Sequence, residues 1–143
     1  MSLCVTIDKL ENNEYEGCLA LLAEDNDLNA EIATEILSMI GINVEHVWNG
    51  KEAVEKMSKV PDGYYDIIFM DIQMPQMNGF EATRAIRDID RDYCKNVPIL
   101  AMSANALVQD VVLSKEAGMN EHLAKPIDFH ELTDALHKWL KKK

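Results

Sequence analysis

Five short apolar runs alternate with segments of helical periodicity along this chain of 143 residues, and this alternation restricts its fold more than any other feature. A helix between two strands carries the chain back across the sheet, so the two strands pair in parallel. The runs occupy residues 18–23, 43–47, 64–70, 97–102 and 121–124. The sequence therefore predicts one α/β domain with a five-stranded parallel sheet and five helices on both of its faces.

Helices are expected where apolar residues recur at helical spacing between the runs. They cover residues 27–40, 50–59, 79–88, 106–117 and 128–140. The polar stretch at 89–96 is expected to be a loop. Five β-α units in succession are typical of the flavodoxin-like three-layer sandwich, whose strand order 2-1-3-4-5 makes strands one and three neighbours. Residues 1–16 lie outside this pattern and are interpreted as a linker with a tag remnant, which leaves residues 17–143 as the domain.

The composition limits the functions that the chain can have. Its 25 acidic residues exceed the 14 basic ones and give a formal charge of −11. Since such a surface repels phosphate backbones, direct binding to nucleic acid is not expected. Three cysteines without a Cys-x-x-Cys pair indicate neither a disulfide framework nor a zinc site. No apolar run is long enough to span a bilayer, so the domain is expected to be cytoplasmic and to make no membrane contact.

Polar side chains follow four of the five runs. Glu24 and Asp25 follow the first run, Asp71 follows the third, Ser103 the fourth and Lys125 the last. Because the carboxyl ends of parallel strands meet at one edge of a sheet, these groups are expected to converge. Three neighbouring carboxylates repel one another unless a cation or protons offset their charge, and their hard oxygen atoms suit Mg²⁺.

Each of these residues also has an ordinary interpretation when it is considered alone. Asp25 or Asp27 could cap the first helix, Ser103 could cap a helix after its strand, and Lys125 could be a solvated surface charge. Their common position at strand ends favours a functional site over these separate interpretations.

The order of these motifs along the chain resembles the receiver domain of two-component response regulators and hybrid histidine kinases, over residues 17–143. The resemblance implies that Asp71 accepts a phosphoryl group from a phosphohistidine of a histidine kinase or of a histidine phosphotransfer protein. It also implies that the domain catalyses only its own phosphoryl uptake and hydrolysis, so its classification as an enzyme stays undecided. A phosphorylation-dependent dimer is a further expectation.

A metal site is also implied by the resemblance. Asp25, Asp71 and the main-chain carbonyl of Gln73 are then direct ligands of Mg²⁺, and Glu24 acts indirectly, through a water molecule or by positioning the metal. Mn²⁺ is expected to be able to replace Mg²⁺ at such a site.

The resemblance assigns roles to the remaining motif residues. Lys125 is expected to contact both the acceptor carboxylate and the phosphoryl group, and the Ser103 hydroxyl to bond a phosphoryl oxygen and to take part in the switch. A cis peptide bond between Lys125 and Pro126 is expected to aim the ammonium group at the site. Receivers often carry Tyr or Phe where this chain has His122, so the sequence puts that part of the switch in doubt.

Several segments resemble receivers attached to hybrid histidine kinases more than free-standing regulators. They include Asn26, Asn29, and residues 80–84 and 104–106. A kinase core before this segment would support the first interpretation, and a DNA-binding domain after it would support the second.

Three alternative functions agree less well with the sequence. A phosphatase of the haloacid dehalogenase type needs a second Asp two residues after the nucleophile, where this chain has Gln73. A flavodoxin-type binding module needs a Gly-, Ser- or Thr-rich phosphate loop after the first strand, where this chain has the acidic residues 24–27. A receiver that serves only for docking is disfavoured because all five active positions are filled.

Overall fold

The computed structural model describes residues 15–104 and 108–140. Within them, five parallel strands form one sheet in the order β2-β1-β3-β4-β5, which confirms the predicted strand order. The strands are β1 (Leu19–Ala23), β2 (Asn43–Val47), β3 (Ile67–Asp71), β4 (Ile99–Ser103) and β5 (Glu121–Ala124). All five residues of β3 and of β4 are buried, as expected for strands that are covered on both faces of the sheet.

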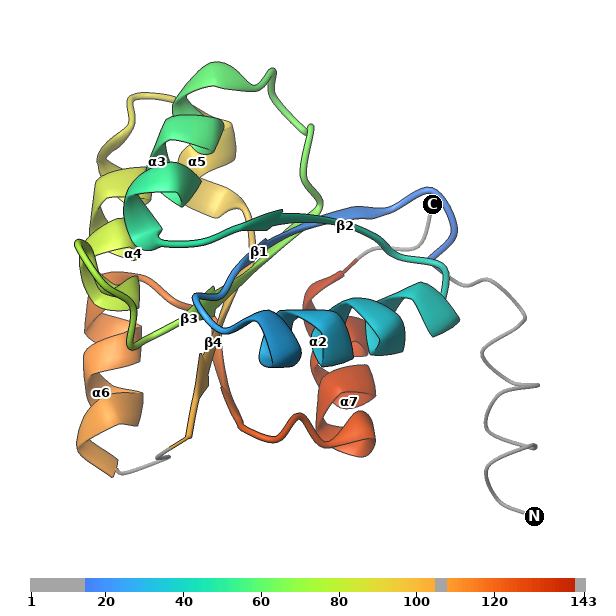
Figure 1. The fold of residues 1–143 in the computed structure, drawn as a ribbon. Coiled ribbons are helices and arrows are strands. Elements are labelled where there is room, and N and C mark those ends of the chain that lie inside the picture. Colours follow the sequence, from blue (N-terminus) through green and yellow to red (C-terminus); the bar gives the residue numbers. More distant parts are fainter. Residues whose placement is uncertain (1–14, 105–107, 141–143) are drawn as a thin grey trace, which may run out of the picture.

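Helices cover both faces of this sheet. They are α2 (Asp27–Met39), α3 (Gly50–Lys59), α4 (Gly79–Asp88), α5 (Asp92–Asn96), α6 (Val108–Ala117) and α7 (Phe129–Trp139). Helices α2 and α7 lie on one face, and α3, α4 and α5 lie on the other (Figure 1). The molecule is therefore a three-layer α/β sandwich, as predicted.

The predicted secondary structure was wrong in one segment. Residues 89–96 were expected to form a loop, but Asp92–Asn96 form the short helix α5, so the described residues contain six helices instead of five. Its other side chains are at least partly exposed, which agrees with the polar sequence, while Cys94 is buried in the core. One buried residue in a single turn leaves too little periodicity for the helix to be predicted. The predicted helix start at residue 106 lies outside the described residues.

The first and last helices begin at polar caps. The Asn26 side chain accepts a hydrogen bond from the main-chain N–H of Asn29, so Asn26, and neither Asp25 nor Asp27, caps α2. The Asp128 side chain caps α7 by accepting hydrogen bonds from the main-chain N–H groups of His130 and Glu131. Since a cap fixes the first turn of a helix, Asn26 fixes where α2 starts relative to the acidic residues before it.

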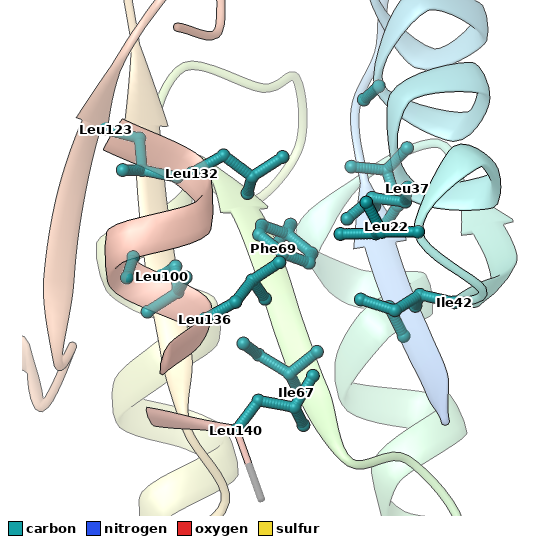
Figure 2. Close-up of a cluster of buried hydrophobic side chains, with 14 of the residues drawn as sticks. Leu22, Leu37, Ile42, Ile67, Phe69, Leu100, Leu123, Leu132, Leu136 and Leu140 are labelled. Atoms are coloured by element: carbon teal, nitrogen blue, oxygen red, sulfur yellow. The ribbon is translucent and has the colours of Figure 1, made fainter. Parts of the chain in front are cut away.

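The core is divided by the sheet into two clusters. On the face of α2 and α7, Phe69 of β3 lies between Leu132 and Leu136 of α7 on one side and Leu22 and Leu37 on the other (Figure 2). The opposite cluster packs β3 and β4 against α3, α4 and α5. These contacts fix the position of β3, whose last residue is Asp71.

The start of the predicted domain and the lengths of the helices can also be compared with the structure. Tyr15, which lies before the predicted domain start at residue 17, is buried in the α2 and α7 cluster. The boundary at residue 17 stays a prediction. Among the described residues, no helix is both long and apolar enough to cross a membrane.

A half-buried arginine ties together the edge of the sheet at the amino ends of β4 and β5. Arg87, near the end of α4, donates hydrogen bonds to the carbonyl oxygens of Gly118 and Cys94 and to the side chain of Asn120. The Asn120 side chain in turn accepts a hydrogen bond from the main-chain N–H of Ile99. Helix α4, helix α5 and the starts of β4 and β5 are therefore joined at this edge.

Candidate functional site

Three carboxylates converge at the carboxyl ends of β1 and β3. The register of these strands pairs Ala23 with Met70, which places Glu24 and Asp25 beside Asp71. One oxygen atom from each of the three carboxylates lies within 4.8 Å of the others. Glu24 and Asp71 are buried, whereas Asp25 is exposed. The cluster is therefore open to solvent on the side of Asp25.

Lys125 provides the positive charge that faces this cluster. Its Nζ atom lies 2.5 Å from Oε1 of Glu24 and 3.2 Å from Oδ2 of Asp71. The Lys125 main-chain N–H donates to the carbonyl oxygen of Ser103, and the Lys125–Pro126 peptide bond is cis. With all groups ionised, three carboxylates and one ammonium group leave a net charge of −2 at the site.

The surrounding protein shifts the pKa values of Asp71 and Lys125. Burial, reinforced by the negative charge of Glu24, raises the pKa of Asp71 to about 7, although Lys125 opposes this rise. Burial alone would lower the pKa of Lys125, but its hydrogen bond to Glu24 and the charge of Asp71 outweigh burial and raise it. Burial is the main cause of the raised pKa of Asp71, and added positive charge at the site would favour the ionised carboxylate.

The loop after β3 passes close to Asp71. The main-chain N–H of Gln73 points at Oδ1 of Asp71 over 3.4 Å, and the N–H of Gly79 donates to the carbonyl oxygen of Ile72. A Cβ atom at Gly79 would collide with the carbonyl oxygen of Asp71. Only a glycine therefore lets α4 begin this close to the end of β3.

Ser103 and His122 lie next to this cluster. Ser103 is the last residue of β4, is buried, and pairs in register with Ala124, which directly precedes Lys125. The Ser103 hydroxyl oxygen lies 3.3 Å from Nε2 of His122. The fold thus brings the predicted residues at the strand ends together at the carboxyl edge of the sheet, whereas His122 lies within β5, opposite Ala101.

Two features beside the site were not predicted. Ser114 of α6 is buried and contacts the second ring nitrogen of His122. A single serine inside a helix gives no sequence signal for such a contact, because most helical serines face solvent. A small cavity of about 30 Å³ lies beside Glu24 and Lys125, and its other lining residues include Ile32 of α2 and Ile127.

The chain is similar to known histidine kinases. Residues 20–137 match the sequence pattern of a family described as the response regulator receiver domain. The peroxide stress-activated histidine kinase mak1 of Schizosaccharomyces pombe is 40% identical over 124 residues, covering 85% of this chain and 8% of that protein. Hybrid signal transduction histidine kinase L of Dictyostelium discoideum is 34% identical over 120 residues, covering 83% of this chain and 7% of that protein. The chain therefore spans less than a tenth of either relative.

Solved structures of receiver domains resemble most of this chain in fold. One is the receiver domain of sensor histidine kinase PA1611 from Pseudomonas aeruginosa PAO1, whose crystal structure holds a magnesium ion in the active-site cleft. This match is 38% identical in sequence, has a TM-score of 0.76, and covers 86% of this chain and 97% of that chain. A co-crystal structure joins the Saccharomyces cerevisiae histidine phosphotransfer signalling protein Ypd1 to the receiver domain of its downstream response regulator Ssk1. The match to it is 30% identical with a TM-score of 0.76, covering 87% of this chain and 90% of that chain.

Proposed function

We propose a specific phosphoacceptor role, centred on Asp71, for this chain, which belongs to the family of response regulator receiver domains of two-component phosphorelay systems. Asp71 takes a phosphoryl group from a phosphohistidine of a histidine kinase or a histidine phosphotransfer protein. The convergence of Glu24, Asp25 and Asp71 with the shared ion pair of Lys125 is the observation that carries this proposal. We also propose that the parent is a hybrid histidine kinase in the cytoplasm.

The transfer step needs no acid or base at the acceptor. An oxygen of the Asp71 carboxylate forms a bond to phosphorus while the bond from phosphorus to the donor imidazole nitrogen breaks, and the electron pair returns to that imidazole. Lys125, already 3.2 Å from Asp71, offsets negative charge on the transferred group. The Ser103 hydroxyl donates to a phosphoryl oxygen. Attack by water on phosphorus later releases inorganic phosphate and restores the carboxylate.

The residues at the site fit Mg²⁺, since the donor set consists of hard oxygen atoms with a deficit of positive charge. Asp25, Asp71 and the main-chain carbonyl of Gln73 would hold the ion, and Glu24 would act through water. When bound, Mg²⁺ supplies positive charge that offsets the repulsion between the carboxylates and an anionic donor. Mn²⁺, which also prefers oxygen ligands, is proposed to substitute.

The test of this function is phosphoryl uptake by the intact chain from acetyl phosphate. We expect mass spectrometry to detect one added phosphoryl group when Mg²⁺ is present and none in excess chelator. Equal labelling in both conditions would rule out the proposed metal dependence.

We place the docking surface for the phosphohistidine partner at the start of α2. This helix begins directly after the acidic residues, so a donor beside Asp71 must contact its first turn. Leu28 in that turn is 64% exposed, and Asn26 and Asn29 flank it. Pro126 and Ile127 form the opposite side of the cavity beside the site. An apolar side chain that is exposed here loses contact with water when a partner docks, which stabilises the complex.

Replacing Leu28 with Glu should slow phosphoryl transfer from a cognate phosphohistidine protein by about 10-fold, because burial of an exposed Leu contributes on the order of 1 to 2 kcal/mol. Labelling by acetyl phosphate should stay nearly unchanged, since the small donor needs no docking. The two rates are measured on the same protein preparation. Met39→Glu is the matched control, because Met39 is 43% exposed at the far end of the same helix.

The comparison separates docking from chemistry. If both reactions slow together in Leu28→Glu, Leu28 supports the site and the surface is wrongly placed. If Met39→Glu slows transfer as much as Leu28→Glu, a general effect of negative charge on α2 explains the result.

A further inference from the structure

Strand β2 holds both polar groups of the Glu24 main chain. The N–H of Glu24 donates to the carbonyl oxygen of Val47, and the carbonyl oxygen of Glu24 lies 2.8 Å from Nε2 of the His46 imidazole. A carbonyl oxygen only accepts, so Nε2 carries a ring hydrogen and donates it. This carbonyl belongs to the peptide group that joins Glu24 to Asp25. The imidazole of His46 therefore fixes the orientation of that peptide group.

A side chain donates at this position because the pairing of β1 with β2 ends here. Ala23 and Val47 are the last pair in register between the two strands, and two residues later Asn49 caps α3. The chain thus turns out of the sheet before β2 can offer a further main-chain N–H to Glu24. Glu24 is buried, and a buried carbonyl without a donor costs free energy. His46 supplies the donor that the ladder no longer provides.

The imidazole of His46 packs against an aromatic ring that is itself fixed at its main chain. The ring centroids of His46 and Trp48 lie 4.2 Å apart, and the two planes are inclined at 52°. The main-chain N–H of Trp48 donates to Oε1 of Glu52 in the first turn of α3. His46 also lines a hollow together with Ala30 and Glu31 of α2. These neighbours restrict rotation of the imidazole and keep Nε2 directed at Glu24.

The carboxylates of Glu24 and Asp25 are held in different ways. The Glu24 side chain contacts Lys125 and accepts a hydrogen bond from the main-chain N–H of Asn26. Asp25 is exposed, and the residue after it, Asn26, caps α2. The position of the Asp25 carboxylate is therefore set mainly by the main chain on either side of it. His46 holds the peptide group before Asp25, and the helix cap holds the residue after it.

We propose that His46 is a positioning residue for the metal site, because it holds the peptide group between Glu24 and Asp25 so that the Asp25 carboxylate faces Asp71. This inference rests on the proposed function, in which Asp25 and Asp71 are direct ligands of Mg²⁺. His46 binds no metal ion itself and acts only through the peptide group. Residues that orient metal ligands in this way change the metal affinity when they are replaced.

The affinity of the intact chain for Mg²⁺ tests this role, measured by titration with MgCl2 and main-chain NMR signals. His46→Phe keeps an aromatic ring beside Trp48 but has no N–H, so we expect it to weaken Mg²⁺ binding by roughly 5- to 10-fold. His46→Gln offers a side-chain amide N–H in place of Nε2, so its affinity should stay within about 2-fold of the wild type. The matched control is His137→Phe, which makes the same change at an exposed histidine of α7, outside the acidic cluster.

The pattern across the three variants decides whether the hydrogen bond is responsible. Equal affinities of His46→Phe and the wild type would overturn the inference. Equal weakening in His46→Phe and His46→Gln would also overturn it, since the ring and not its N–H would then matter. Weakening in His137→Phe as large as in His46→Phe would show that any such exchange of histidine disturbs the site, and the inference would fail.

A measurement on the wild type in chelator needs neither a variant nor a metal ion. A hydrogen bond to the Glu24 carbonyl slows exchange of the Nε2–H of His46 with water, so this ring N–H should give a visible NMR signal at pH 8. Its absence overturns the inference even if Mg²⁺ binds normally, and it decides the matter if His46→Phe does not fold. Absence of Mg²⁺ binding by the wild type overturns the proposed metal site instead, and with it the role of His46.

Discussion

Replacing Asp71 with Asn is expected to lower Mg²⁺-dependent phosphoryl incorporation from acetyl phosphate by roughly 100-fold or more. The amide keeps the size and shape of the carboxyl group but offers no anionic oxygen for attack on phosphorus. Lys125 contacts both Glu24 and Asp71, so the position of the label, and not this ion pair, decides between the two carboxylates. Mass spectrometry of the intact chain and of its peptides measures both the amount and the position of the label.

The control for this experiment is Asp134→Asn. It makes the same chemical change at an exposed aspartate of α7, outside the acidic cluster. We expect Asp134→Asn to be labelled like the wild type. Unreduced labelling of Asp71→Asn, or a label that maps to another residue in the wild type, would refute Asp71 as the acceptor.

Asp71→Asn is also expected to melt at a higher temperature than the wild type in chelator at pH 8. The pKa of Asp71 rises from 3.8 to about 7 in the fold, mainly because the group is buried and faces Glu24. As the pH rises from about 4 to about 7, the unfolded chain loses this proton before the folded one, so wild-type stability falls. The full loss is present above the raised pKa and amounts to about 2 to 4 kcal/mol. The expected difference in melting temperature is roughly 5 to 15 °C.

The dependence of the melting temperatures on pH and on Mg²⁺ shows whether the charge of Asp71, or better packing of the Asn side chain, stabilises the variant. The difference between the two proteins should shrink as the pH falls through 7 and vanish only well below the ordinary pKa of 3.8, where Asp71 is protonated in both the folded and the unfolded state. Millimolar Mg²⁺ should raise the melting temperature of the wild type more than that of the variant, by linkage. Differential scanning calorimetry at several pH values measures both effects. A wild-type melting temperature that does not respond to Mg²⁺ would contradict the proposed metal site.

The sequence was sufficient to predict the strand order of the sheet and the convergence of the polar residues that follow its strands. Alternating runs determine a parallel sheet, and the order 2-1-3-4-5 then brings the ends of β1 and β3 together, which places Glu24 beside Asp71. Four of the five strands are followed by a candidate site residue at a position that the sequence pattern alone defines.

Other parts of the structure depend on tertiary contacts that have no local signal. Cys94 is buried in one helical turn among polar residues, so α5 was missed. The contact between His122 and Ser114 joins a strand to the middle of a helix, and neither residue type indicates the other. Tyr15 is buried by α2 and α7, although the sequence around it is polar.

Arg87 anchors the edge of the sheet that lies opposite the candidate site. Arg87 joins the turn before β5 to α4 and α5 through carbonyl oxygens, which do not titrate and do not change on phosphorylation. These hydrogen bonds therefore hold α4, α5 and the turn before β5 together whatever the charge at Asp71. Any movement of β5 relative to α4 is accordingly expected to be smallest at the Arg87 edge of the sheet and largest at the carboxyl edge.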